Sequence, residues 1–252
     1  MDNVGPPLSA GPPTISADGR WLWNGTQWTA RAGPTGFRSL NAHRTWAVAA
    51  LAAWIASAAL QLIADATRIS IASAVINGTG VSLTDAQNSD SLVSLAALIH
   101  LGVFVLAAVA FLMWLYRAVA NNHALGAYEL RFTPGWAVGW WFVPVANLVR
   151  PLQITAEAWR AADPSASRST AEMRSRLRTP AIVIAWWLLY LIGNVIALFE
   201  RWTSGDPLTR LRSATELDVV SLVVLSGAAG MAIILVVLLT RREEAKIRQL
   251  TP

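Results

Sequence analysis

Four long stretches without a charged residue constrain the fold of this 252-residue chain more than any other feature. They cover roughly Trp46–Ala64, Leu92–Tyr116, Ala181–Phe199 and Val219–Thr240. About 20 residues of α-helix cross the ~30 Å hydrocarbon core of a bilayer. A backbone in lipid must also satisfy its own hydrogen bonds, which a helix does. The sequence therefore predicts four transmembrane helices.

Composition supports a membrane protein and excludes some chemistry. Only 14% of the residues are charged and 54% are hydrophobic, whereas a soluble domain has about 25% charged residues. The chain has no cysteine, so it forms no disulfide and offers no thiolate metal ligand. Its first 45 residues lack the apolar core of a signal peptide, and we expect the first span to act as an uncleaved anchor.

The distribution of basic residues predicts the orientation of the helices. The segment before the first span, the three loops and the tail carry 4, 1, 8, 3 and 4 Lys and Arg residues in turn. Because cytoplasmic segments are enriched in Lys and Arg, both termini and the central loop are expected on the cytoplasmic side of the membrane.

A fifth apolar segment, Thr133–Val149, lies near the lower limit of length for a span. If it crossed the membrane, the five Arg residues between positions 160 and 178 would move outside. The charge distribution therefore favours an interfacial or re-entrant segment, residues 133–162, packed against the bundle. Labelling of a Ser167→Cys variant from outside by an impermeant maleimide would contradict this arrangement.

The most distinctive motif begins at the end of the second span with Trp114, Arg117 and Asn121. Arg117 and Asn121 are four residues apart and share a helix face. A Trp- and Pro-rich block, Pro134–Leu148, follows. Thr133 and Pro134 suit the start of a helix, and Pro144 must end or kink it.

This motif permits two interpretations. The favoured one is structural, because Trp, Pro and Asn at a membrane surface commonly serve as anchors, kinks and caps. The other is a cytoplasm-facing pocket for an anionic lipid headgroup or a small molecule, since Arg and Asn donors beside aromatic walls suit a ligand site. The candidate residues of that site are Arg117, Asn121, Trp140, Trp141, Asn147 and Glu157.

Because of this motif, the chain from Trp46 to its C-terminus resembles the family named domain of unknown function 4328, found in actinobacteria. The resemblance implies a multi-pass membrane protein and no assigned activity. A shorter N-terminal stretch, described next, is similar to the domain of unknown function 2510 family, although it lacks that family's leading Gly-Trp-Tyr-x-Asp-Pro element.

The N-terminal region is predicted to contain a small β-hairpin at residues 18–30, between a Pro- and Gly-rich disordered tail (1–17) and a linker (31–45). Asn24-Gly25 is a strong two-residue turn signal, and this turn would pair Trp21 with Trp28 and Trp23 with Thr26. The side chains of Trp21, Trp23 and Trp28 would then share one face. They are candidates for docking a partner protein or inner-leaflet headgroups; the alternative is a hairpin packed on itself or on the bundle.

Polar residues inside the spans are few. His100, Gln61 and Asn194 are expected to form contacts between helices, and the spacing of Ser226 and Gly230 suggests a close helix approach. No span holds two carboxylates, so a proton-coupled transporter is not predicted. No phosphate-binding loop, hydrolase motif or metal cluster is present, and we expect no cofactor, no metal and no nucleic-acid partner.

The sequence thus predicts an all-α integral membrane protein with a membrane domain at 46–240, an interfacial segment, an N-terminal hairpin and a basic cytoplasmic tail at 241–252. The favoured function is a non-enzymatic scaffold or sensor that docks a partner through the Trp hairpin. The alternative is a protein that binds or transports a lipid or small molecule through the central motif. The sequence leaves oligomeric state and ligand open.

Overall fold

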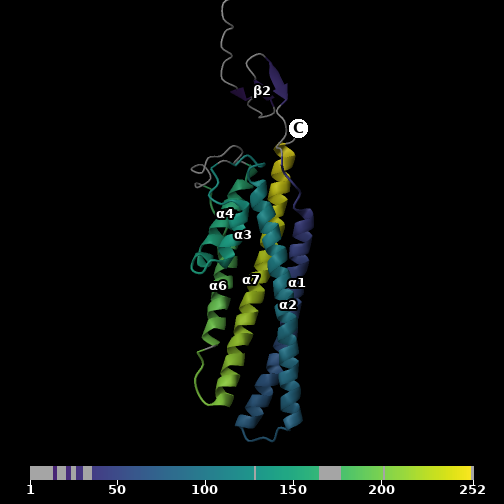
Figure 1. The fold of residues 1–252 in the computed structure, drawn as a ribbon, viewed down its shortest axis with the longest axis vertical. Helices are drawn as coiled ribbons and strands as arrows, with labels where there is room; N and C mark the ends of the chain where they lie inside the picture. Colours follow the sequence, from purple (N-terminus) through teal and green to yellow (C-terminus); the bar gives the residue numbers. More distant parts are fainter. Residues whose placement is uncertain are drawn as a thin grey trace, which may run out of the picture.

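Four long helices form the molecule (Figure 1). The computed structural model describes residues 14–15, 21–23, 27–30, 36–127, 129–164, 177–200 and 202–250. The long helices are α1 (Asn41–Ile76), α2 (Leu83–Asn121), α6 (Ala181–Glu200) and α7 (Pro207–Leu250). Each is long and apolar enough to cross a membrane. The predicted helical architecture with four candidate spans is confirmed.

Three of these helices extend well beyond the apolar stretches that identified them. Helices α1, α2 and α7 have 36, 39 and 44 residues, or roughly 54, 59 and 66 Å at 1.5 Å per residue. Side chains cap the N-termini of α2 and α7. Ser82 Oγ accepts a hydrogen bond from the Asp85 amide, and Asp206 Oδ1 accepts hydrogen bonds from the amides of Leu208 and Thr209. Segments predicted as loops or tail are therefore helical.

Helices α1 and α7 form the centre of the bundle. Helix α1 packs against α2 and α7, and α7 packs against α6. The start of α1 lies beside the last turns of α7. The Ser39 hydroxyl and the Leu40 amide, just before α1, both donate to Glu244 Oε1 of α7, at 2.6 and 3.1 Å. We call this the terminal end of the bundle. Its core includes the fully buried side chains of Leu40, Trp114, Leu115, Leu235 and Leu239.

Helices α6 and α7 approach each other closely at Gly193. A Cβ atom there would lie 2.6 Å from the Leu225 side chain, and Ser221 Oγ donates a 3.1 Å hydrogen bond to the Gly193 carbonyl. Gly230, predicted to permit such an approach, has no neighbouring atom within 4 Å of the position that a Cβ would take. The small residue that permits close packing is therefore on α6.

The Trp- and Pro-rich segment folds into short helices at the terminal end. They are α3 (Pro134–Gly139), the 3₁₀ turns η1 (Trp140–Phe142) and η2 (Ala146–Leu148), and α4 (Arg150–Ala161). As predicted, the helix does not continue through Pro144, and Val145 takes a φ of +65°, rare for a β-branched residue. With only six residues, α3 is too short to form a fifth span.

Short strands are present near the N-terminus: β1 (Thr14–Ile15), β2 (Trp21–Trp23) and β3 (Trp28–Ala30). Strand β2 pairs antiparallel with β3 in a register that places Trp23 opposite Trp28 and Trp21 opposite Ala30. The predicted pairing of Trp21 with Trp28 is therefore wrong, because four residues rather than two connect the strands. Residues 24–26 lie outside the described residues, and the hairpin as a folded module stays a prediction.

Candidate functional site

The side-chain amide of Asn121 connects three parts of the chain at the terminal end. Its Nδ2 donates to the Arg38 carbonyl and to Glu243 Oε2, both at 3.0 Å, and its Oδ1 accepts from the Arg38 amide at 3.2 Å. Asn121 and Glu243 are both fully buried. These bonds hold the backbone before α1 against α2 and α7, and so they fix where the Arg38 side chain begins.

Beside this link lies an open groove of about 650 Å³. One wall is a face of α2, on which Val109, Met113, Tyr116 and Arg117 recur at helical spacing. The other wall comes from the start of α1 and from α3. We call it the Arg117 groove. Its lining consists of Arg38, Ser39, Ala42, His43, Val109, Leu112, Met113, Tyr116, Arg117 and Val138.

The polar end of the Arg117 groove is basic. Arg38 and Arg117 both line it, and no acidic side chain is among the lining residues. Arg117 Nε and His43 Nδ1 are buried and have no hydrogen-bond partner among the described residues. Because a buried donor without an acceptor is costly, this end of the groove is suited to an anion.

The other end of the groove is apolar and open. Val109 is 51% exposed, Met113 55% and Tyr116 46%, although all three belong to a helix able to cross a membrane. Exposed apolar side chains on such a helix suit contact with lipid. The groove therefore joins an apolar surface to a basic end.

Of the six residues predicted to share a pocket, the structure brings only Arg117 and Asn121 together. Arg117 lines the groove, whereas Asn121 lies beneath it with both ends of its amide already bonded. Glu157 has a structural role instead: its two carboxylate oxygens accept from the amides of Arg131 and Phe132, at 3.0 and 3.3 Å. It thereby holds the chain entering α3, where Thr133 makes no side-chain cap.

Trp140 and Trp141 point to different surroundings. The Arg150 guanidinium lies 5.2 Å from the centroid of the Trp140 ring, as in cation–π contacts. Trp141 packs among Phe111, Trp186, Trp187 and Tyr190. It lines a separate crevice of about 170 Å³ between α1, α2, α6 and α7. Neither Trp140 nor Trp141 lines the Arg117 groove, and their part in a ligand site stays a prediction.

Asn147 closes the turn at Pro144 through its backbone. Its backbone amide donates to the Val143 carbonyl at 2.9 Å across Pro144. Its side-chain oxygen is buried without a partner among the described residues. The backbone, rather than the side-chain amide, thus satisfies the carbonyl next to the proline.

Sequence reasoning missed Arg38 and His43 as groove residues. Both lie in the segment leading into α1, where Arg38 contributed only to the charge count. The spacing of Arg117 from the apolar residues of α2 predicted one wall of the groove, but nothing local indicated which distant segment would form the other. Among the described residues, no group of three or more His, Asp and Glu side chains is placed to hold a metal ion.

The predicted docking residues are only partly described. Trp21 and Trp23 lie in β2, with side chains outside the described part of the structure, and the Trp28 side chain is 48% exposed. Their use as a docking surface stays a prediction.

No curated protein and no solved structure matches this chain. The family model described as Domain of unknown function (DUF4328) matches residues 77–241, which include α2, the short helices at the terminal end, α6 and most of α7. The chain therefore belongs to the DUF4328 family.

Proposed function

We propose that this protein binds an anionic phospholipid in the Arg117 groove. The phosphate would lie between Arg38 and Arg117, and an acyl chain would follow the apolar face of α2 from Met113 to Val109. The observation that carries the proposal is the buried, unpartnered Arg117 Nε at the end of an exposed apolar stripe. A phosphate oxygen supplies the acceptor that the guanidinium lacks, in a charge-assisted hydrogen bond.

The proposal includes an orientation. The terminal end would lie at the cytoplasmic surface of a bacterial plasma membrane. The positive-inside distribution of Lys and Arg supports this placement. Anionic lipids of the inner leaflet would then face Arg38 and Arg117.

The test measures lipid binding by the purified full-length protein. Short-chain phosphatidylglycerol, phosphatidylcholine and inorganic phosphate are titrated separately against wild type and Arg117→Ala. We expect phosphatidylglycerol to bind best and Arg117→Ala to weaken it by roughly 10- to 150-fold, since a hydrogen bond to a charged group contributes about 1.5–3 kcal/mol.

The matched control is Arg241→Ala, which removes an exposed Arg of α7 that does not line the groove. It should bind phosphatidylglycerol as wild type does. Equal losses in the two variants, or equal binding of phosphatidylcholine, would contradict the proposal. Tight binding of inorganic phosphate alone would instead identify a soluble anion as the ligand.

A scaffold role through the N-terminal Trp residues is the second proposal, and the half-exposed indole of Trp28 supports it. A stoichiometric partner that crosslinks to wild type in native membranes should be lost in the Trp21→Ala/Trp28→Ala double variant. Trp46→Ala, which removes another exposed Trp outside the N-terminal strands, serves as the control. Partner lists that do not differ would exclude docking through these residues.

A further inference from the structure

The crevice between α1, α2, α6 and α7, about 170 Å³ in volume, is separate from the Arg117 groove. Helix α2 packs mainly on α1, and α6 packs on α7, so the two pairs leave space between them. Protein interiors are close-packed, and small side chains leave a void where the helix backbones do not approach closely. Those that line this one are Ala107 and Ala108 of α2 and Ala228, Ala229 and Ala232 of α7.

The other walls of this space are largely aromatic, and we call it the aromatic crevice. Trp54 of α1 and Phe104 of α2 line one part, with their ring centroids 6.2 Å apart. Phe111 of α2, Trp141 of η1 and Trp186 of α6 line another, with centroids 5.8 to 6.4 Å apart. Such walls favour a flat, conjugated ring, which can stack on one aromatic ring and meet the edge of another.

Two indole N–H groups of the lining have no acceptor. Trp54 is 8% exposed, and the Nε1 atoms of Trp54 and Trp141 are buried without a hydrogen-bond partner among the described residues. Trp187, which does not line the crevice, donates its Nε1 to the Leu148 carbonyl at 3.0 Å. A buried donor without an acceptor is costly, and an indole N–H can only donate. The crevice is therefore suited to a molecule that brings acceptor oxygens.

The aromatic crevice is bordered by surfaces that suit lipid. Phe104 of α2 and Asn194 of α6 line it and are both exposed, although each belongs to a helix apolar enough to span a membrane. The lining residues of the described structure include no acidic or basic side chain, and burying a charge without a partner is far more costly than burying a neutral group. A suitable occupant is therefore neutral and soluble in the membrane.

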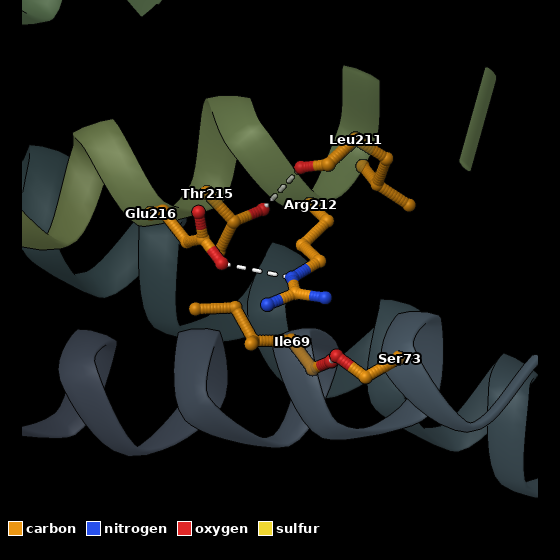
Figure 2. Close-up of polar contacts among 6 residues, drawn as sticks. All are labelled: Ile69, Ser73, Leu211, Arg212, Thr215 and Glu216. Atoms are coloured by element: carbon orange, nitrogen blue, oxygen red, sulfur yellow. Dashed lines mark hydrogen bonds and ion pairs between the residues drawn. The ribbon is translucent and has the colours of Figure 1, made fainter. Parts of the chain in front are cut away.

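The packing of α1 on α7 indicates where such a molecule would enter. These two helices stay in contact toward the end of the bundle away from the terminal end, where Figure 2 shows Arg212 of α7 beside Ile69 and Ser73 of α1. Arg212 Nε donates there to Glu216 Oε1 at 2.8 Å, within α7. We therefore expect entry between α2 and α6, rather than between α1 and α7.

We propose that the aromatic crevice binds a neutral, membrane-soluble molecule of the quinone class. A quinone has two carbonyl oxygens on opposite sides of one flat ring, and these would accept from Trp54 Nε1 and Trp141 Nε1. The crevice is smaller than the ~300–1,000 Å³ pockets that enclose drug-sized ligands. It would hold the ring, while an apolar chain on the ring passes between α2 and α6 into the lipid. This site is independent of the lipid site in the Arg117 groove.

The experiment measures binding of menadione, a methylated naphthoquinone, to the purified full-length protein by equilibrium dialysis in detergent. Methylnaphthalene, which has the same two rings without oxygen atoms, is the comparison ligand, and both affinities are corrected for partition into detergent. The chain has no cysteine, so no thiol of the protein can add to the quinone. We expect menadione to bind more tightly, by roughly 2- to 13-fold for each hydrogen bond formed.

Three single variants test the two donors. Trp54→Phe and Trp141→Phe each remove one N–H group and keep an aromatic ring. Each should weaken menadione binding by roughly 2- to 13-fold and leave methylnaphthalene binding nearly unchanged, and either variant suffices if the other does not fold. Trp187→Phe is the matched control, because Trp187 is buried and packs against Trp141 but does not line the crevice. It should bind both ligands as wild type does.

A further variant tests the location. Ala108→Phe places a ring in the crevice and should block both ligands. Menadione binding no tighter than that of methylnaphthalene, equal losses in Trp54→Phe and Trp187→Phe, or unchanged binding in Ala108→Phe would each overturn the proposal. Arg117→Ala should leave menadione binding unchanged, and Trp54→Phe should leave phosphatidylglycerol binding unchanged, so the two sites are tested separately.

Discussion

Replacing Asn121 with alanine is expected to lower the free energy of unfolding by about 3–5 kcal/mol, since each of three lost hydrogen bonds contributes roughly 1 kcal/mol and a buried polar group left without its partner costs about 1–3 kcal/mol more. The variant loses three hydrogen bonds: two to the Arg38 backbone and one to Glu243. The more costly consequence concerns Glu243, which is fully buried and has no partner for its other carboxylate oxygen among the described residues. Without Asn121, its Oε2 would lose the amide donor as well.

The measurement is a denaturation midpoint of the purified protein in detergent. Asn122→Ala is a matched control, because Asn122 is also buried but its side-chain oxygen has no hydrogen-bond partner in the described structure. We expect Asn122→Ala to cost much less than Asn121→Ala. Similar losses in the two variants would show that volume, rather than the link to Arg38 and Glu243, explains the effect.

Replacing Trp114 with alanine should have a comparable effect, about 3–5 kcal/mol, as expected for a buried Trp or Phe truncated to Ala. Trp114 is fully buried against Phe111, with 5.5 Å between ring centroids. Its Nε1 donates a 3.0 Å hydrogen bond to Thr240 Oγ1 of α7. Truncation therefore opens a cavity between α2 and α7 and leaves a buried hydroxyl group without its donor.

Two further variants separate packing from hydrogen bonding at this position. Trp114→Phe keeps most of the ring but loses the bond to Thr240, and should cost less than Trp114→Ala. Met113→Ala changes the adjacent residue, which is 55% exposed, and should be nearly neutral. If Met113→Ala were as destabilising as Trp114→Ala, the assignment of Trp114 to the core would be wrong.

The four candidate spans could be predicted because the bilayer imposes a length and an absence of charge that a single sequence displays directly. The ends of the helices could not be predicted in the same way. The apolar stretch that identified α7 begins at Val219 and ends at Thr240, yet the helix runs from Pro207 to Leu250. Charged residues beyond an apolar stretch end the signal for a span but continue a helix, since Arg, Glu and Lys are good helix formers.

The site was predicted less completely for a related reason. The shared face of Arg117 and Asn121 followed from helical spacing, but the partners of Asn121 are 83 and 122 residues distant. Nothing in local periodicity indicates that α1 and α7 meet at that level. The same limitation applies to Trp140, Trp141 and Arg117, which the sequence assigned to one pocket and which the structure places in different surroundings.

The length of α7 has a mechanical consequence. Asp218 and Glu243 lie on the same unbroken helix, 25 residues apart, which corresponds to roughly 38 Å at 1.5 Å per residue. A helix transmits axial displacement and rotation along its length because every turn is hydrogen-bonded to the next. If α7 turns or slides at Asp218, Glu243 turns or slides with it, and Asn121 and Arg38 must follow or release their bonds. The two ends of the bundle are therefore connected by one continuous, stiff helix, through which a displacement at one end reaches the other.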